Sequence, residues 1–235
     1  MTAASFLRPD PPEDFFKTAR FNMVESQLRP NRVLGERLLN AMGHLPREAF
    51  VAQDQQSFAY SDEEIPVGFG RKMVSPMVFA RLLQEVRVQP TDRVLDIGAA
   101  TGYSCAVLNE LAGEVIALES EAALMRVLQQ NKSRFLLENV RPVQGNLNEG
   151  HPPAAPYQVI LIEGGVQWLP ENLFMQLAEG GRLACVTLSP SRGLPDLLGR
   201  ARIYEKKAGR IKMRDLFDAT APLLPAFAAR PHFEF

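Results

Sequence analysis

A short stretch in the middle of the chain has the residue types of a ligand-binding loop. It reads Val94-Leu-Asp-Ile-Gly-Ala-Ala-Thr-Gly-Tyr-Ser104, so an apolar strand is expected to run into a turn with Gly98 and Gly102 and then into a helix. In a doubly wound sheet, the turn after the first strand lies at the ligand crevice. Glycine there lets the backbone approach a ligand closely and adopt a positive φ. The stretch therefore predicts a small-molecule site.

The spacing of the glycines separates two kinds of ligand. The dinucleotide pattern needs glycines at its first, third and sixth positions, which here are Gly98, Ala100 and Tyr103, so two of the three fail. A pattern of an acidic residue followed by three alternate glycines, typical of S-adenosylmethionine sites, departs only at Ala100. S-adenosylmethionine carries no phosphate and needs fewer converging N–H groups, so we expect it as the cofactor. The expected contacts are Asp96, Gly98, Ala100, Gly102 and Tyr103; an ordinary strand-turn-helix is the alternative.

Two further polar residues follow the next two expected strands. Glu119 ends the strand at 114–119, where a carboxylate can accept both ribose hydroxyls of a nucleoside. Asn146 follows the strand at 140–144, where its amide could read an adenine ring or could simply form a turn. The sequence therefore predicts Glu119 as a ribose contact and Asn146 as a candidate adenine contact.

The chain lacks the usual machinery for acid–base or metal chemistry. Its histidines, His44, His151 and His232, are scattered, no Gly-x-Ser-x-Gly motif occurs, and no cluster has metal-ligand spacing. Cys105 and Cys185 are expected to be reduced core thiols. Methyl transfer to a carboxylate tolerates this absence, because a carboxylate is already ionised at pH 7 and needs positioning and exclusion of water rather than a base.

Length and composition set the outer limits. The 235 residues include 46% hydrophobic residues, and 26 Lys+Arg against 27 Asp+Glu give a net charge of -1. This excludes global disorder and argues against binding nucleic acid by bulk electrostatics. No stretch is apolar enough to span a bilayer, and the N-terminus lacks the pattern of a secretory signal. We therefore expect a cytoplasmic globular protein without nucleic-acid or membrane partners; the sequence leaves its oligomeric state open.

The expected pattern of secondary structure changes near residue 90. Before it, helices are expected at 12–28, 34–42, 46–50 and 76–86, with a polar loop and one or two short strands at 53–72. After it, strands at 93–97, 114–119, 140–144, 158–162 and 181–188 alternate with helices at 103–112, 122–137 and 172–177, and a hairpin follows at 201–217. This alternation predicts an α/β, Rossmann-like fold: a doubly wound, mostly parallel sheet with a C-terminal antiparallel hairpin. We expect a helical extension at 1–89 and the methyltransferase core at 90–235.

Several segments together resemble the protein-L-isoaspartate O-methyltransferase family. The matching segments are Met23-Val-Glu-Ser-Gln-Leu28, Pro46-Arg-Glu-Ala-Phe-Val51, Ala59-Tyr-Ser-Asp62 with Ile65-Pro-Val-Gly68, the loop from Asp96 to Tyr103, and Gln176-Leu177 with Gly180-Gly-Arg-Leu183. Their order over roughly residues 20 to 235 is more specific than any one of them. The resemblance implies S-adenosylmethionine-dependent esterification of isoaspartyl carboxylates in damaged proteins or peptides, with the N-terminal extension on the substrate side.

The chain departs from this family at the expected acceptor side. Val74 stands where the family carries a serine hydroxyl near the reacting carboxylate, and Ser75, one residue later, is the candidate catalytic residue and also a candidate helix cap. Asn146 replaces an aspartate. Glu163 adds a carboxylate near the methyl-transfer crevice, where it could repel an anionic substrate or bind a cationic group. The alternatives are therefore a methyltransferase for another protein or small-molecule acceptor, and a non-catalytic S-adenosylmethionine-binding protein of the same fold.

Overall fold

A computed structural model of the protein describes residues 13–189 and 198–229. The N-terminal part forms helices and a small two-stranded sheet. Its elements are α1 (Glu13–Asn22), a π-helical continuation (Met23–Leu28), α2 (Glu36–His44), 3-10 turns (Arg47–Phe50 and Gln53–Phe58), β1 (Ile65–Gly68), β2 (Arg71–Met73) and α3 (Pro76–Val86). Pro76 opens α3, where its missing N–H is harmless.

Strands and helices then alternate, as expected for a doubly wound sheet. The elements are β3 (Arg93–Ile97), α4 (Tyr103–Leu111), β4 (Glu114–Glu119), α5 (Ala122–Arg134), β5 (Val140–Gln144), β6 (Tyr157–Val166), α6 (Glu171–Met175), β7 (Leu177–Leu188), β8 (Gly199–Lys207) and β9 (Arg210–Ala219). The seven strands form one sheet in the order β5-β4-β3-β6-β7-β8-β9. Pairing is parallel from β5 to β7 and antiparallel at β7–β8 and β8–β9, which confirms the predicted fold class and the C-terminal hairpin.

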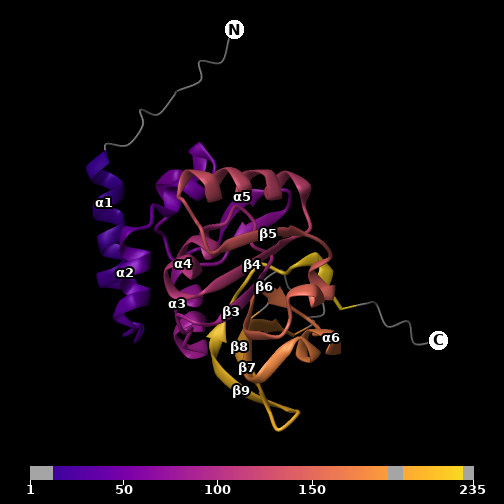
Figure 1. Ribbon diagram of the computed structural model, residues 1–235. Helices are drawn as coiled ribbons and strands as arrows, with labels where there is room; N and C mark the ends of the chain where they lie inside the picture. The colour runs from indigo at the N-terminus through magenta and orange to yellow at the C-terminus, as the bar shows by residue number, and fades with distance from the viewer. Residues whose placement is uncertain (1–12, 190–197, 230–235) are drawn as a thin grey trace, which may run out of the picture.

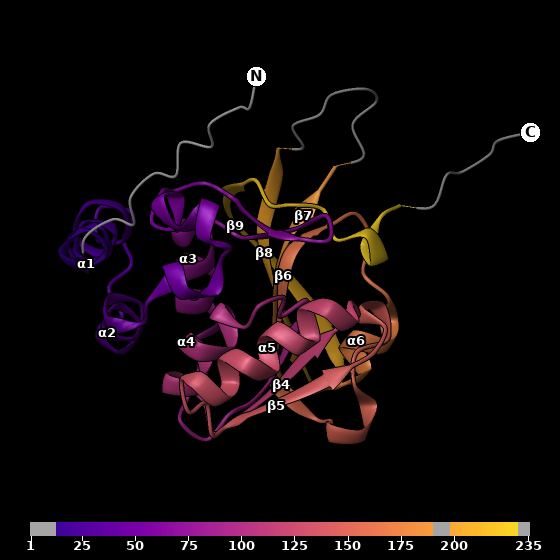
Figure 2. The same ribbon diagram turned by 90° about the horizontal axis from the view of Figure 1, so that it is seen from above.

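The two faces of the sheet bury two hydrophobic clusters. Helices α3, α4 and α5 cover one face, and α1 and α2 lie beyond them, whereas α6 lies on the opposite side (Figures 1 and 2). Along β3, Val94 packs into the first cluster and Leu95 into the second, as the alternation of side chains in a strand requires. The first cluster joins apolar residues of the N-terminal helices to the sheet, so the extension and the core share buried surface.

The boundaries differ from the expected ones in three places. The first predicted helix continues to Leu28, but its last six residues are π-helical. Helix α5 ends at Arg134 rather than at residue 137, and Leu136 has a φ of 52°, which a helix does not allow. Leu177, expected in a helix, begins β7 and pairs with Tyr157. In each case the local pattern is right and the element's end is set by packing.

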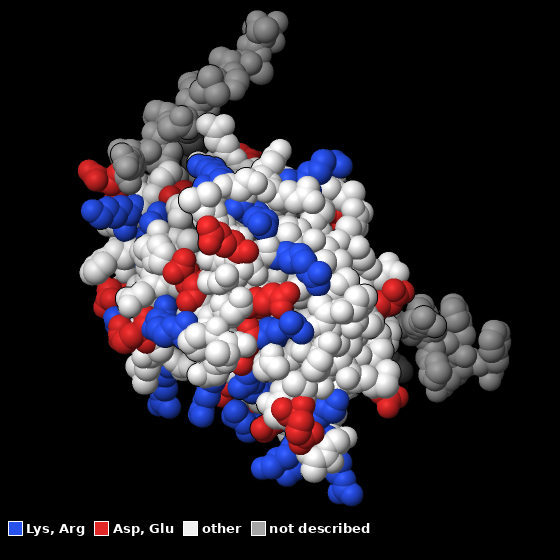
Figure 3. Space-filling view, viewed as in Figure 1, with Lys and Arg blue, Asp and Glu red and all other residues white. Residues whose placement is uncertain are grey.

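The surface carries both charges. On the face in Figure 3, basic and acidic side chains are intermixed and neither sign covers a continuous area. Cys105 and Cys185 are buried and free, as predicted. Among the described residues no helix is long and apolar enough to cross a membrane, and no group of His, Cys, Asp or Glu there is placed to hold a metal ion.

Candidate functional site

Three carboxylates meet where neighbouring strands of the sheet end. Asp96 lies near the end of β3, Glu119 ends β4, and Glu163 lies on β6, one residue beyond Ile162, which pairs with the end of β3. The strand β3 has β4 on one side and β6 on the other. The order in which successive parallel strands are added to the sheet therefore reverses at β3. This reversal is where open α/β sheets bind ligands.

The glycine loop at this edge is held in unusual backbone conformations. Gly98 has a φ of 83° and Gly102 one of 94°, both in the left-handed region that favours glycine. A Cβ on Gly98 would lie 2.8 Å from Arg71 Nη2, whereas one on Gly102 would lie 3.2 Å from Leu128 Cγ on α5. Gly98 therefore leaves room for a group over the loop, and Gly102 leaves room for helix packing. Ala100 has a φ of 48°, so a residue with a Cβ adopts a glycine-like conformation.

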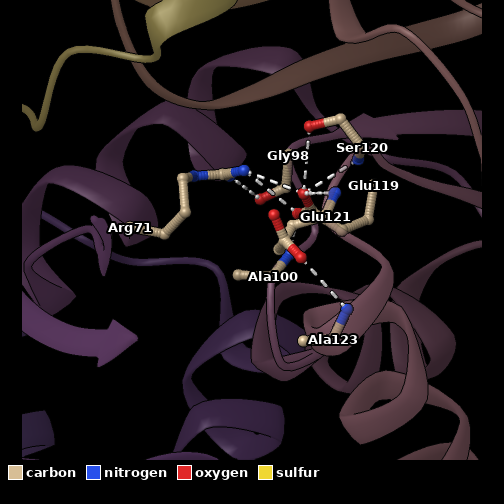
Figure 4. Close-up of polar contacts among 7 residues, drawn as sticks. All are labelled: Arg71, Gly98, Ala100, Glu119, Ser120, Glu121 and Ala123. Carbon is tan, nitrogen blue, oxygen red and sulfur yellow. Dashed lines mark hydrogen bonds and ion pairs between the residues drawn. The ribbon is translucent and has the colours of Figure 1, made fainter. Parts of the chain in front are cut away.

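The Glu119 carboxylate is fully buried and bonds the loop (Figure 4). Its Oε2 accepts from the Ala100 N–H at 2.9 Å, and its Oε1 accepts from the N–H groups of Ser120 and Glu121 at 2.8 and 3.0 Å. Arg71 Nη1 lies 2.9 Å from Oε1 and 3.2 Å from Oε2. Because a carboxylate offers about four acceptor positions, Glu119 has no acceptor position left.

Arg71 comes from β2 in the N-terminal part and lies across the loop. Its side chain is 7% exposed, and its Nη2 donates to the Gly98 carbonyl oxygen at 2.9 Å. Arg71 therefore pairs with the Glu119 carboxylate inside the protein, and its guanidinium lies directly beside that carboxylate.

Asp96 is fully buried behind the loop and is only half satisfied. Its Oδ2 accepts from Ser104 Oγ at 2.6 Å and from Cys105 Sγ at 3.1 Å, while Oδ1 has no partner. Burial raises the pKa of Asp96 to about 6, and these two hydrogen bonds oppose that rise. The site thus holds a free, buried acceptor atom suited to a cationic group.

Arg47 is a fully buried arginine on the acceptor side. Nε donates to the Ala59 carbonyl at 2.8 Å and Nη2 to the Val74 carbonyl at 2.6 Å, and the guanidinium lies 4.6 Å from the centre of the Tyr103 ring. Arg47 and Tyr103 are near enough to shift each other's pKa, but neither Arg47 Nη1 nor the Tyr103 hydroxyl completes a hydrogen bond. Two buried donor groups therefore remain available.

A narrow cavity joins these groups to the loop. Its lining comprises Arg47, Lys72, Met73, Val74, Phe79, Gly98 to Thr101, Tyr103, Ser104 and Glu163, and its volume is about 20 Å³, enough for about one water molecule. Burial and the nearby Asp96 raise the pKa of Glu163 well above its usual range, against the opposing effect of Arg47 and Arg71. This environment favours the uncharged form of Glu163, which weakens its repulsion of an anionic substrate.

The structure brings most of the predicted site residues together. Asp96, Gly98, Ala100, Tyr103, Glu119 and Glu163 surround the loop. Asn146 is exposed and donates to Glu149 Oε1 at 2.8 Å. Ser75 is buried and occupies the N-cap position of α3, as predicted, but its hydroxyl makes no capping hydrogen bond, and Val74 rather than Ser75 lines the cavity.

Sequence reasoning missed the roles of Arg47 and of the Arg71–Glu119 pair. The available signal was weak: Arg47 lies between apolar residues, in Leu45-Pro-Arg-Glu-Ala-Phe50, where a solvated arginine is unexpected. Nothing near Arg71 in the sequence points to Glu119.

Comparisons with known proteins agree on one family. The model of the family described as "Protein-L-isoaspartate(D-aspartate) O-methyltransferase (PCMT)" matches residues 19–216. A protein-L-isoaspartate O-methyltransferase of Koribacter versatilis is 35% identical over 203 residues, covering 86% of this chain and 89% of that protein. One of Methylorubrum populi is 34% identical over 212 residues, covering 90% and 97%.

Solved structures show the same fold. A protein-L-isoaspartate O-methyltransferase superposes with a TM-score of 0.74 at 26% identity, covering 86% of this chain; the chain spans 64% of that protein's length. A Plasmodium falciparum structure in complex with S-adenosyl-L-homocysteine superposes with a TM-score of 0.69 at 20% identity, covering 88% of this chain and 96% of that one.

Proposed function

The chain belongs to the protein-L-isoaspartate(D-aspartate) O-methyltransferase family, and we propose that it transfers a methyl group from S-adenosylmethionine to the carboxylate of L-isoaspartyl residues in damaged proteins. The observation that carries the proposal is the buried Glu119 carboxylate at the end of β4, bonded to the Ala100 N–H of the glycine loop. A carboxylate at this place suits the two hydroxyls of a ribose.

The residues around the loop fit this cofactor. Gly98 provides a cradle that a Cβ would fill, and Asp96 Oδ1 is a free buried acceptor for the ammonium of the methionine moiety. The ribose hydroxyls would take the two acceptor positions on Glu119 that Arg71 now holds, so Arg71 must move aside when the cofactor binds. Tyr103 would close the far side of the loop, and Asn146 stays a candidate for the adenine.

For this reaction the protein mainly has to position the cofactor and the acceptor carboxylate. When bound, the cofactor supplies an activated methyl group: a carboxylate oxygen bonds to the methyl carbon, the carbon–sulfur bond breaks, and its electron pair stays on sulfur. No proton moves, so the step needs no general base. The chain's own residues orient the two reactants and exclude water.

The test compares the isoaspartyl and aspartyl forms of one peptide with labelled S-adenosylmethionine. We expect base-labile label on the isoaspartyl form and none on the aspartyl form. Binding of S-adenosylhomocysteine without transfer to the isoaspartyl form would overturn the isoaspartyl assignment.

A different carboxylate acceptor is the second candidate. It is favoured by Val74, whose apolar side chain lines the cavity, whereas the hydroxyl of Ser75 lies on a residue outside that lining. If so, incubating the protein and labelled cofactor with a cell extract should give base-labile label on molecules without isoaspartate. Pretreating the extract with an active isoaspartyl methyltransferase and unlabelled cofactor should not reduce that label.

A further inference from the structure

Arg47 carries a buried charge that the rest of the described protein does not neutralise. Its side chain is fully buried, yet none of the ion pairs among the described residues includes it. Its two hydrogen bonds go to neutral carbonyl groups of Ala59 and Val74. A buried charge without a counter-charge is costly, so natural proteins keep one where a partner is to come.

The nearest carboxylic acid does not fill this place. Glu163 lines the same cavity as Arg47 and interacts with it electrostatically, but it lies outside ion-pair distance, and its burial favours the uncharged form. Asp96, the other buried acid nearby, directs its bonded oxygen to Ser104 and Cys105 and makes no ion pair with Arg47.

Two free donors next to one another define the chemistry of the missing partner. Arg47 Nη1 and the Tyr103 hydroxyl are both buried and unbonded, and both residues line the cavity beside Gly98 and Glu163. Burial raises the pKa of Tyr103, so its hydroxyl keeps its proton and can donate. A cation with a free NH2 group and a neighbouring O–H matches the two oxygens of one carboxylate.

We propose that Arg47, together with the Tyr103 hydroxyl, binds the acceptor carboxylate that is methylated. This inference rests on the proposed function and assigns the binding of the acceptor to residues other than Ser75. The bond from Arg47 Nη2 to the Val74 carbonyl ties the acceptor-side backbone to the same guanidinium. Methylation converts the carboxylate into a neutral ester, so the ion pair with Arg47 exists before transfer and is lost after it, which favours release of the product.

The test measures how much each residue contributes to recognition of the negative charge. With S-adenosylhomocysteine bound, the dissociation constants of an isoaspartyl peptide and of the same peptide with a carboxamide in place of that carboxylate are compared. In the wild type we expect the carboxamide to bind at least 30-fold more weakly. In Arg47→Met this ratio should fall to near 1, and in Tyr103→Phe it should fall several-fold, because a hydrogen bond to a charged group contributes about 10- to 100-fold.

Controls separate a binding role from a structural one. Arg20→Lys alters another arginine of the extension, which is paired with Glu48 at 3.0 Å, and should leave the ratio unchanged. The affinity for S-adenosylhomocysteine should stay within about three-fold in Arg47→Met and in Arg20→Lys. Tyr103→Phe removes only an unbonded hydroxyl, so it decides the question by itself if Arg47→Met does not fold.

The outcomes are distinct. A wild type that methylates the isoaspartyl peptide, with the same carboxamide-to-carboxylate ratio in Tyr103→Phe and Arg47→Met, would overturn this inference and leave the proposed function standing. A wild type that transfers no methyl group to the isoaspartyl peptide would overturn the proposed function itself.

Discussion

The two buried arginines of the site are held in opposite ways. Arg71 is bonded to the Glu119 carboxylate through two contacts and to the Gly98 carbonyl, so the cofactor side of the site is internally satisfied. The Arg47 guanidinium bonds only carbonyl groups and keeps its Nη1 group unbonded, so the acceptor side is internally incomplete. A ligand on the cofactor side must therefore break an existing ion pair, whereas a ligand on the acceptor side supplies a missing one.

This contrast gives the two arginines opposite expected effects. Removing Arg71 should strengthen binding of the cofactor. Removing Arg47 should weaken binding of the acceptor. A chain in which both replacements weakened binding would show that the two sides do not differ as described.

On the cofactor side, Arg71→Gln is expected to tighten binding. Glutamine cannot form the charged pair, so the ribose no longer has to displace a guanidinium from Glu119, and S-adenosylhomocysteine should bind about 10-fold more tightly, since a hydrogen bond to a charged group is worth about 1.5–3 kcal/mol. Calorimetric titration measures this. Lys72→Gln is the matched control, because Lys72 is 48% exposed and pairs only with Glu64. Weaker binding in Arg71→Gln would mean that Arg71 itself holds the cofactor.

Asp96→Asn should stabilise the free protein on the cofactor side. The pKa of Asp96 is about 6 in the folded protein against an ordinary value of 3.8, so its ionisation opposes folding, and stability is lost as pH rises through this window. At pH 7.5 the variant should gain about 1–3 kcal/mol in urea unfolding, and at pH 3.5 the gain should vanish.

Asp92→Asn is the control for this measurement. Asp92 pairs with Arg182 at 2.9 Å, so its replacement should lose stability at pH 7.5. A loss of similar size in Asp96→Asn would show that the fold relies on the charged form. The affinity of Asp96→Asn for the cofactor should fall, because the free Oδ1 acceptor of Asp96 is replaced by an amide group.

A smaller effect is expected for the loop itself. Ala100 has a φ of 48°, a conformation that costs a residue with a Cβ about 1 kcal/mol, so Ala100→Gly should raise the free energy of unfolding by about 0.5–1 kcal/mol. Ala123→Gly, in the first turn of α5, should lower it by up to about 1 kcal/mol. Equal losses in both variants would contradict the strain assigned to Ala100.

The smallest effect at neutral pH is expected for Glu163→Gln. Because burial and the nearby Asp96 raise the pKa of Glu163, its uncharged form is favoured, and the KM for an isoaspartyl peptide should change by less than about three-fold. As pH rises and Glu163 ionises, it should compete for Arg47 and repel the substrate carboxylate, so the KM of the wild type should rise while that of the variant stays flat. Identical pH profiles of KM would refute this role.

Much of the fold and the cofactor half of the site follow from local patterns. The strand–loop–helix from Val94 to Ser104 and the carboxylate at Glu119 are readable because one short segment contains both the periodicity and the motif. The π-helical segment at Met23–Leu28 and the start of β7 at Leu177 were not, since tertiary packing and pairing with Tyr157 decide them.

The pairings that distinguish the two sides could not be predicted. Arg71 and Glu119, and Arg47 and Val74, are far apart in sequence and meet only because β2 and the turn before it lie over the sheet edge. Local sequence also cannot decide which residue lines the cavity: Ser75 takes the N-cap position of α3, as its place before Pro76 predicts, but Val74 lies at the cavity.

Glu119 is the residue on which the account depends most directly, and one titration tests it. S-adenosylhomocysteine is titrated into the wild type and into Glu119→Ala at the same pH and salt concentration, with circular dichroism as the check of folding. The account predicts saturable binding to the wild type and at least a 100-fold loss of affinity in the folded variant. Unchanged affinity in Glu119→Ala would contradict it.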